Sequence, residues 1–345
     1  MRRRDFITTV PVAGAAILAA PHIARAQATT LRLHQFLPPQ ATIPSGILVP
    51  WADQVAEASD GDLTIQHFDA MALGGAPPDL FDQARDGIAD ITMTVVGYTP
   101  GRFPRTEVFD LPFLMRDPVA TSRAYWDMME NELQDAEFGD VKILASWVHG
   151  PGVIHSNQPV TTPDDMAGLT VRGPTRVIAD MLAQLGAEPV GMPVPAIPEA
   201  ISRGVINGTV IPWEVTATLR LSELLSNHTE FASNEALYTT PFVLAMNRAA
   251  YEGLPDDLRT ALDSVSGSDA SAFAAQVMLD GDGPARQIAV DAGNDIITID
   301  EAASAPWREA ALPVIDDWIA SRAEQDVDGQ ATLDRARALI EQYSA

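Results

Sequence analysis

Cysteine is absent from all 345 residues of this chain, and lysine occurs once, at Lys142. The absence of cysteine excludes disulfides, thiolate nucleophiles, and zinc or iron–sulfur sites held by cysteine. The 47 acidic residues outnumber the 22 lysines and arginines, so that the formal net charge is −25. Because a phosphate backbone requires a basic surface, we expect no binding to nucleic acid.

Motifs of several common enzyme classes are also missing. The chain has no Gly-x-x-x-x-Gly-Lys loop and no Gly-x-Ser-x-Gly elbow, and residues 281–284 (GDGP) lack the third glycine of a dinucleotide-binding loop. No histidine has a partner four residues away, as a helical zinc site requires. We therefore predict no cofactor, no metal site and no catalytic residue.

Residues 1–28 have the pattern of an export signal. Three arginines at positions 2–4 precede an apolar run at 10–20 that is too short to span a bilayer as a helix. Small residues allow cleavage near residues 26–28. The order Arg-Arg-Asp-Phe-Ile at 3–7 fits a twin-arginine signal, and an ordinary secretory signal is the alternative. We expect a periplasmic protein whose mature chain does not insert into the membrane.

Strand and helix patterns alternate in two separate parts of the chain. The patterns predict strands at 30–36, 63–68, 89–96, 169–172, 205–211 and 239–247, with helices between them at 47–55, 79–86 and 176–185. Segments 84–90 and 201–207 share a helix end, a glycine, an apolar residue, a spacer and Asp or Asn. This alternation predicts an α/β fold with two similar lobes.

The predicted lobes are discontinuous in sequence. We expect residues 29–150 plus about 238–280 to form lobe I, and residues 151–237 plus about 281–345 to form lobe II with the C-terminal helices. Because no flexible linker joins them, the chain crosses between the lobes near a hinge. A ligand then binds in the cleft between them.

Several ordered segments carry a resemblance to a known family. They are 109–113 (FDLPF), 164–172 (DDMAGLTVR), 186–193 (GAEPVGMP), 204–208 (GVING) and 251–255 (YEGLP). Together they resemble the DctP family, the solute-binding proteins of tripartite ATP-independent periplasmic (TRAP) transporters, over essentially the whole mature chain.

The resemblance implies a two-lobed periplasmic-binding-protein fold with strand crossovers between the lobes and a long helix packed across both. It also implies capture of a small organic carboxylate in the interlobe cleft, and delivery to a small and a large membrane subunit. A periplasmic hydrolase on a two-lobed scaffold and a ligand-sensing receptor for a signalling partner are the alternatives.

Arg172 matches the carboxylate-binding arginine of that family. A guanidinium group presents a planar fork that meets a carboxylate through two hydrogen bonds and stays protonated. The residue stands at the end of a predicted strand, where open α/β sheets bind ligands. The alternative is a salt bridge with one of the many acidic side chains.

Six further residues are candidates for the ligand site. Trp213 is a candidate wall of the pocket or part of a lobe core. Glu214 is a candidate acceptor for a ligand hydroxyl or ammonium group, or a surface acid. The other four align with cleft loops or, for the histidine, lie in a glycine-rich stretch: Phe36, Tyr98, Trp147 and His149.

Four positions depart from the sialic-acid-binding branch of the family. Gly152, Ile211 and Val95 stand where that branch carries an arginine, an asparagine and an acidic residue, and Tyr98 replaces an arginine. A polyhydroxylated ligand would leave buried hydroxyls unpaired, at a cost of about 1–3 kcal/mol each. We therefore expect a smaller or more apolar carboxylate than a sugar acid.

Overall fold

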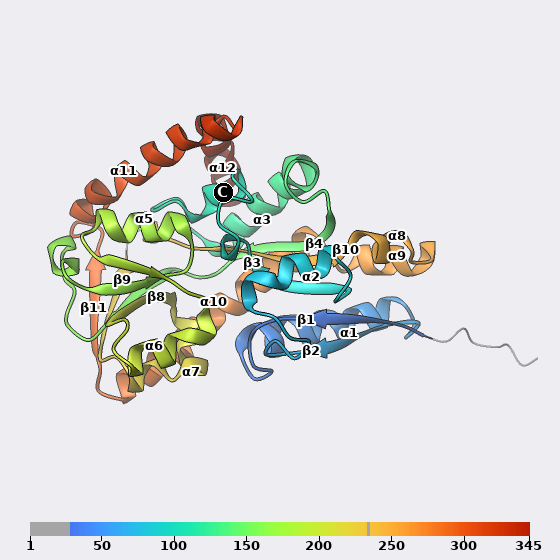
Figure 1. Cartoon of the computed structure of the whole chain (residues 1–345), viewed down its shortest axis with the longest axis horizontal. Helices are drawn as coiled ribbons and strands as arrows, with labels where there is room; N and C mark the ends of the chain where they lie inside the picture. Colours follow the sequence, from blue (N-terminus) through green and yellow to red (C-terminus); the bar gives the residue numbers. More distant parts are fainter. Residues whose placement is uncertain (1–27, 233–234) are drawn as a thin grey trace, which may run out of the picture.

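The chain folds around two β-sheets, one in each lobe (Figure 1). This computed structural model describes residues 28–232 and 235–345, so nearly all of the expected export signal lies outside the described residues. The first sheet contains β1 (Thr29–His34), β2 (Leu63–Phe68), β3 (Ile91–Val95), β4 (Val141–Val148) and β10 (Pro241–Asn247). The second contains β5 (Gly152–Ser156), β6 (Thr170–Gly173), β7 (Glu188–Gly191), β8 (Gly208–Pro212), β9 (Asn227–Ala232) and β11 (Asp295–Asp300).

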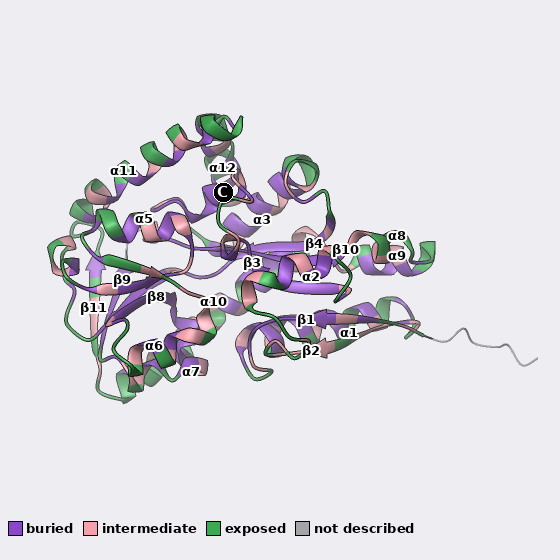
Figure 2. Cartoon of the chain, in the orientation of Figure 1, coloured by how far each residue is buried: buried purple, intermediate pink, exposed green. Residues whose placement is uncertain are grey.

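Both sheets mix parallel and antiparallel pairing. In the order β2-β1-β3-β10-β4, β10 runs antiparallel to both of its neighbours, while β1 is parallel to β2 and β3. In the order β11-β9-β5-β8-β6-β7, β5 is antiparallel to β8 and β9. The central strands β3 and β8 are buried along their whole length (Figure 2), because helices or loops cover both faces.

Helices cover the sheets and connect the lobes. They are α1 (Val49–Ala58), α2 (Leu80–Arg85), α3 (Pro118–Met128), α4 (Gln134–Ala136), α5 (Arg176–Gln184), α6 (Ile197–Ser202), α7 (Trp213–Leu219), α8 (Arg248–Glu252), α9 (Asp256–Ser264), α10 (Ser268–Asp291), α11 (Ala305–Arg322) and α12 (Gly329–Tyr343). None of the described helices is long and apolar enough to cross a membrane.

The chain crosses between the lobes at three places. It leaves the first sheet after β4 and enters the second at β5, then returns between β9 and β10. The 24-residue helix α10 is the third connection, since it packs against α3 and β4 of the first lobe and against α7 of the second. The predicted two-lobed α/β fold, with strand crossovers and a long helix across both lobes, is thus confirmed.

The C-terminal helices divide between the lobes. Helix α11 packs against α5, whereas α12 packs against α3 of the first lobe. The predicted segment 281–345 therefore contacts both lobes rather than lobe II alone. The residue boundaries of the lobes stay a prediction.

The repeated segment found in the sequence has a structural basis. Gly87 and Gly204 both adopt a left-handed conformation, with φ of 71° and 68°, which ends the preceding helix. Three residues later, Asp90 accepts a hydrogen bond from the Arg32 N–H at 2.8 Å, and Asn207 accepts one from the Thr170 N–H at 2.9 Å. In each lobe the Asp or Asn side chain therefore binds the backbone of the neighbouring strand, at Arg32 within β1 and at Thr170, the first residue of β6.

This capping corrects one predicted boundary. The strand predicted to begin at 205 begins at Gly208, because Val205 lies in the turn after Gly204 and is 54% exposed. The prediction included the apolar residues of this turn in the strand, because apolar character alone does not distinguish a turn from a strand.

Candidate functional site

A cavity with about 410 Å³ of empty space lies between the lobes and is lined by residues of both sheets and both crossovers. Its lining comes from the carboxyl ends of β1, β3, β6 and β8, and from the start of β10. Ligands of open α/β sheets bind at such strand ends.

Most of the cavity wall is apolar. The apolar side chains come from both lobes and are Phe36, Leu37, Ile43, Val95, Val194, Ile211, Val215 and Phe242. The Phe36 ring packs against the Tyr98 ring with their centroids 5.6 Å apart. The cavity therefore suits a ligand with an apolar body and few polar groups.

Arg172 is the cation of the cavity, and its guanidinium group is held by backbone carbonyls. Its Nε donates to the Met192 carbonyl at 2.9 Å, and its Nη1 donates to the Val210 carbonyl at 3.1 Å. These carbonyls belong to the segments on either side of β6. The side chain is only 1% exposed, and its Nη2 has no hydrogen-bond partner among the described residues.

Burial lowers the pKa of Arg172 from its ordinary value, because a charged group loses hydration inside the protein. No described acid forms an ion pair with it, so the expected alternative of an internal salt bridge is not observed. A buried cation without an anionic partner is costly. The arrangement is therefore complementary to an anionic ligand.

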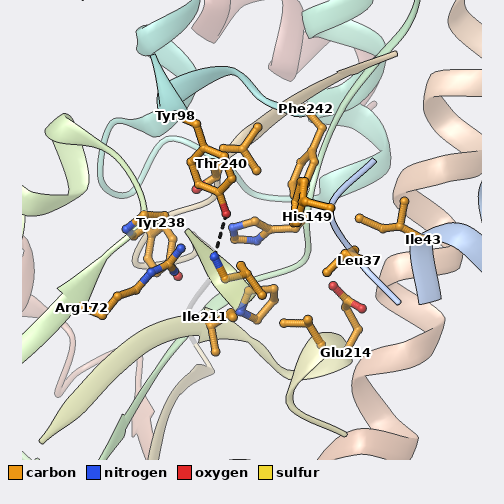
Figure 3. A pocket seen from close by; sticks show the side chains of 16 residues that line it. Leu37, Ile43, Tyr98, His149, Arg172, Ile211, Glu214, Tyr238, Thr240 and Phe242 are labelled. Atoms are coloured by element: carbon orange, nitrogen blue, oxygen red, sulfur yellow. Dashed lines mark hydrogen bonds between the residues drawn. The ribbon is translucent and has the colours of Figure 1, made fainter. Parts of the chain in front are cut away.

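The Tyr238 hydroxyl adds to this polar end of the cavity. It is buried and has no hydrogen-bond partner among the described residues. The Thr240 hydroxyl also lines the cavity but interacts with the buried Asp110 carboxyl group. Figure 3 shows the Tyr238 hydroxyl beside the Arg172 guanidinium group. Together they offer donors that match the two oxygens of one carboxylate.

Gly152 makes the position of Tyr238 possible. A Cβ atom at residue 152 would lie 2.0 Å from Cε1 of the Tyr238 ring, so any side chain there would displace the ring. The backbone N–H of Gly152 also donates to the Tyr238 carbonyl at 3.0 Å. The two crossovers between the lobes therefore pack directly on each other beside the cavity.

Tyr98 connects the lobes across the cavity. Its hydroxyl accepts a hydrogen bond from the Val194 N–H at 3.0 Å (Figure 3). Tyr98 belongs to the turn after β3 in the first lobe, and Val194 follows β7 in the second. This bond therefore requires the two lobes to lie close together.

Glu214 lines the cavity on the side away from Arg172 (Figure 3). It is 5% exposed, and burial raises the pKa of its carboxyl group to about 8. Hydrogen bonding to Thr42 opposes this shift, whereas the nearby Asp282 reinforces it. Asp282 also accepts a hydrogen bond from the Glu214 backbone N–H at 2.9 Å. Burial therefore favours the protonated form of Glu214 near neutral pH.

His149 contributes a neutral imidazole to the cavity. Burial lowers its pKa to about 4. Its Nδ1 lies 2.5 Å from the Gly150 carbonyl, which requires Nδ1 to carry the proton. The remaining Nε2 is therefore a hydrogen-bond acceptor.

Five of the seven predicted site residues line the cavity, and two do not. Trp213 lies in the second lobe, where its Nε1 donates to Glu230 at 3.1 Å and its ring contacts His155 at a centroid distance of 5.1 Å. Trp147 does not line the cavity but packs on Phe242, which does, with 5.7 Å between the stacked ring centroids. The prediction that Trp147 lines the pocket is corrected by its packing, and Trp213 takes the second of its two alternatives, a place in the core of the second lobe.

Sequence reasoning missed Tyr238, Thr240 and Phe242. These residues lie at the crossover into β10, which the sequence placed between the lobes near 237–241. A tyrosine and threonines at an expected crossover were the available signal. The described residues contain no group of three or more His, Cys, Asp or Glu side chains that could hold a metal ion.

Comparison with known proteins agrees with this geometry. Residues 34–322 match the family described as "Bacterial extracellular solute-binding protein, family 7", DctP. A TRAP solute-binding protein from Rhodoferax ferrireducens T118, in complex with copurified benzoate, is 44% identical with a TM-score of 0.90, and the match covers 92% of this chain and 98% of that one.

Two further solved structures are similar. A marine metagenome TRAP solute-binding protein, in complex with 3-hydroxybenzoate, is 40% identical over 93% of this chain and 100% of that one, with a TM-score of 0.91. A TRAP periplasmic solute-binding protein from Bordetella bronchiseptica, with bound mandelate, is 30% identical over 91% and 99%, with a TM-score of 0.83. The chain belongs to the DctP family of bacterial extracellular solute-binding proteins.

Proposed function

We propose that this protein is the periplasmic receptor of a TRAP transporter, and that its ligand is a small aromatic monocarboxylate. The observation that carries the proposal is Arg172, a buried guanidinium group with an unpaired Nη2 in a cavity of mostly apolar walls. The ligand carboxylate binds Arg172, and the Tyr238 hydroxyl donates to the same group.

The charges of the lining favour one carboxylate over two. Arg172 is the sole cation among the residues that line the described cavity, because His149 is neutral. A second carboxylate on the ligand would have to lie against apolar side chains or beside Glu214. Since an unpaired buried charge is strongly unfavourable, a dicarboxylate binds more weakly than a monocarboxylate.

The apolar walls support an aromatic body. Phe36 and Phe242 present ring surfaces to the cavity, and aromatic pairs are stabilised beyond their buried area. The relatives that are 44% and 40% identical bind benzoate and 3-hydroxybenzoate. A sugar acid would leave several hydroxyls against Leu37, Ile211 and Val215 without partners.

Export and transport are parts of the same proposal. The signal at residues 1–28 directs the chain to the periplasm, and a small and a large membrane subunit receive the ligand. Family membership supports this assignment over a hydrolase, because the similar structures are described as solute-binding proteins. A sensing role alongside transport would use the same ligand site.

A thermal-shift and calorimetric screen tests the ligand class. The probes are benzoate, mandelate, succinate and galacturonate, each at a fixed excess. A ligand at 100 times its dissociation constant stabilises a protein by about 2.7 kcal/mol. We expect benzoate or mandelate to stabilise the protein most. Tighter binding of succinate or galacturonate than of every aromatic acid would refute the proposed ligand class.

A further inference from the structure

The cation and the acid of the cavity stand at two separate ends. Arg172 and the Tyr238 hydroxyl lie together on one side, and the Glu214 carboxyl group lies on the other, beside Leu37 (Figure 3). Ile211 and the neutral His149 imidazole line the cavity between them (Figure 3). A ligand whose carboxylate binds Arg172 therefore directs the far side of its body toward Glu214.

Glu214 is held in this position by its place in the fold. It follows Pro212, the last residue of β8, and lies in the first turn of α7. Its backbone N–H donates to Asp282 of α10, and its Cβ would lie 3.0 Å from a Cβ at Gly281. The close approach of α10 at a glycine therefore fixes the Glu214 backbone and directs its side chain into the cavity.

The electrostatic surroundings of Glu214 differ from those of a salt-bridged acid. Its neighbours are the Thr42 hydroxyl and a second acid, Asp282, rather than a cation. Asp282 is itself buried, and burial raises its pKa to about 7. When two acids are buried close together, repulsion between their charges and the loss of hydration favour protonation of at least one of them.

A protonated carboxyl group both donates and accepts hydrogen bonds. It therefore matches a ligand hydroxyl, which does the same, whereas an apolar substituent of equal size makes no hydrogen bond to the side of the carboxyl group that faces the cavity. A site that is built to bind a hydroxyl discriminates strongly against analogues that lack one, because its own polar group then has no partner.

We infer that Glu214 determines ligand specificity by binding a ring hydroxyl of an aromatic carboxylate whose carboxylate group is bound by Arg172. This inference rests on the proposed function and adds the substituent to the ligand class. The preferred ligand is a hydroxylated aromatic monocarboxylate with the hydroxyl on the side of the ring away from Arg172.

Isothermal titration calorimetry tests the inference with matched probes. The ligands are benzoate and its 3-hydroxy, 4-hydroxy, 3-methyl and 4-methyl derivatives. Methyl and hydroxyl groups have similar size, so the ratio of methyl to hydroxyl dissociation constants at one ring position isolates the hydrogen bond. We expect this ratio to be at least tenfold at position 3 or 4 of the ring for the unaltered protein.

Three variants show which side chain is responsible for the ratio of methyl to hydroxyl dissociation constants. Glu214→Leu should reduce it to less than about threefold, and Glu214→Gln, which keeps a donor and an acceptor, should restore most of it. Val215→Ala, in the wall beside Glu214, is the matched control and should leave the ratio unchanged while it alters both affinities. Circular dichroism checks that each variant is folded.

Two results would overturn the inference while leaving the proposed function intact. One is a ratio near one at both ring positions in the unaltered protein. The other is a tenfold ratio that persists in Glu214→Leu and disappears in His149→Phe, which would assign the hydroxyl to the His149 Nε2. Failure of every aromatic acid to bind would instead refute the proposed function, and this inference with it.

Discussion

The Tyr238 ring occupies the space that a side chain at position 152 would require. The distance of 2.0 Å between Cε1 and a Cβ at Gly152 is incompatible with any other residue there unless the ring moves. The sialic-acid-binding branch carries an arginine at this position. In this chain the Tyr238 ring fills the space next to Gly152, and its single hydroxyl is neutral.

Gly152→Ala should therefore weaken ligand binding without unfolding the protein. The added methyl group displaces Tyr238, whose hydroxyl lies beside Arg172, and we expect at least a tenfold increase in the dissociation constant for benzoate. The control is Gly191→Ala, because a Cβ at Gly191 meets nothing within 4 Å. Equal affinities of the two variants in calorimetry would contradict the role given to Tyr238.

Arg172→Ala should abolish detectable binding of benzoate. Truncation of one partner of a buried charge pair costs about 2–5 kcal/mol, which is more than tenfold in affinity. Arg172→Lys should recover little, because an ammonium group cannot donate to Met192, Val210 and the ligand with the geometry of the guanidinium fork. Near-native affinity of either variant would show that the carboxylate binds elsewhere. Arg203→Ala, on the surface, is the control.

The sequence predicted the scaffold better than the pocket. Strand 63–68 coincides with β2, where apolar and polar residues alternate, and strand 239–247 contains β10, which is a short continuous apolar run. Strand 205–211 was wrong at its start, because residues after a left-handed glycine turn are also apolar. Periodicity reports burial, and it does not report where the hydrogen bonding of a strand begins.

Side-chain direction explains the mixed outcome at the site. Arg172 lies in the cavity as predicted, since a strand end fixes its position. At 212–214 the chain changes from strand to helix, and neighbouring side chains point in different directions, so Glu214 lines the cavity while Trp213 packs into the second lobe. Tyr238 was not predicted, because its place depends on Gly152 in the other crossover. Such long-range packing leaves no local pattern in the sequence.

Protonation of Glu214 should make stability depend on pH. Burial raises its folded-state pKa to about 8, whereas the unfolded chain releases this proton at an ordinary value near ~4.3. The contribution of Glu214 to the free energy of unfolding is therefore fully present below its unfolded-state pKa. It is lost as the pH rises through the folded-state pKa of about 8. We expect Glu214 to lower the free energy of unfolding by about 1.5 kcal/mol between pH 6.5 and 8. The buried histidines act in the opposite direction, because they are neutral in the folded protein and about half protonated at pH 6.5 in the unfolded chain.

Urea unfolding at both pH values measures this change. Glu214→Gln should remove most of the decrease, because an amide does not titrate. Asp282, whose pKa is raised to about 7, contributes a smaller decrease in the same window and remains in the variant. Parallel pH profiles of the two proteins would show that Glu214 is ionised in the folded state.

Glu107 should be important for stability because it joins three parts of the chain. Its Oε2 accepts from Arg176 of α5 at 2.7 Å and from Arg322 of α11 at 2.8 Å, and Arg322 is almost fully buried. Glu107→Gln should destabilise the protein by about 3 kcal/mol, since a buried cation loses its anion. The control Glu199→Gln breaks the exposed pair with Arg203 and should cost less than about 1 kcal/mol. Equal effects in urea unfolding would contradict this difference.

Tyr98→Phe should weaken binding by favouring the open arrangement of the lobes. The Tyr98 hydroxyl accepts from the Val194 N–H across the cleft, so its removal leaves that donor unpaired only when the lobes are close. Because ligand encounter precedes closure, the dissociation rate should rise several-fold while the association rate changes little.

Small-angle scattering should show a smaller radius of gyration on addition of benzoate, and a smaller change for the variant at the same benzoate concentration. Tyr251→Phe, which loses a surface bond to Asp263, is the control for removal of a phenolic hydroxyl. If the scattering profile stays unchanged at saturation, the cavity is rigid, and the Tyr98 bond then contributes to the fold rather than to closure around the ligand.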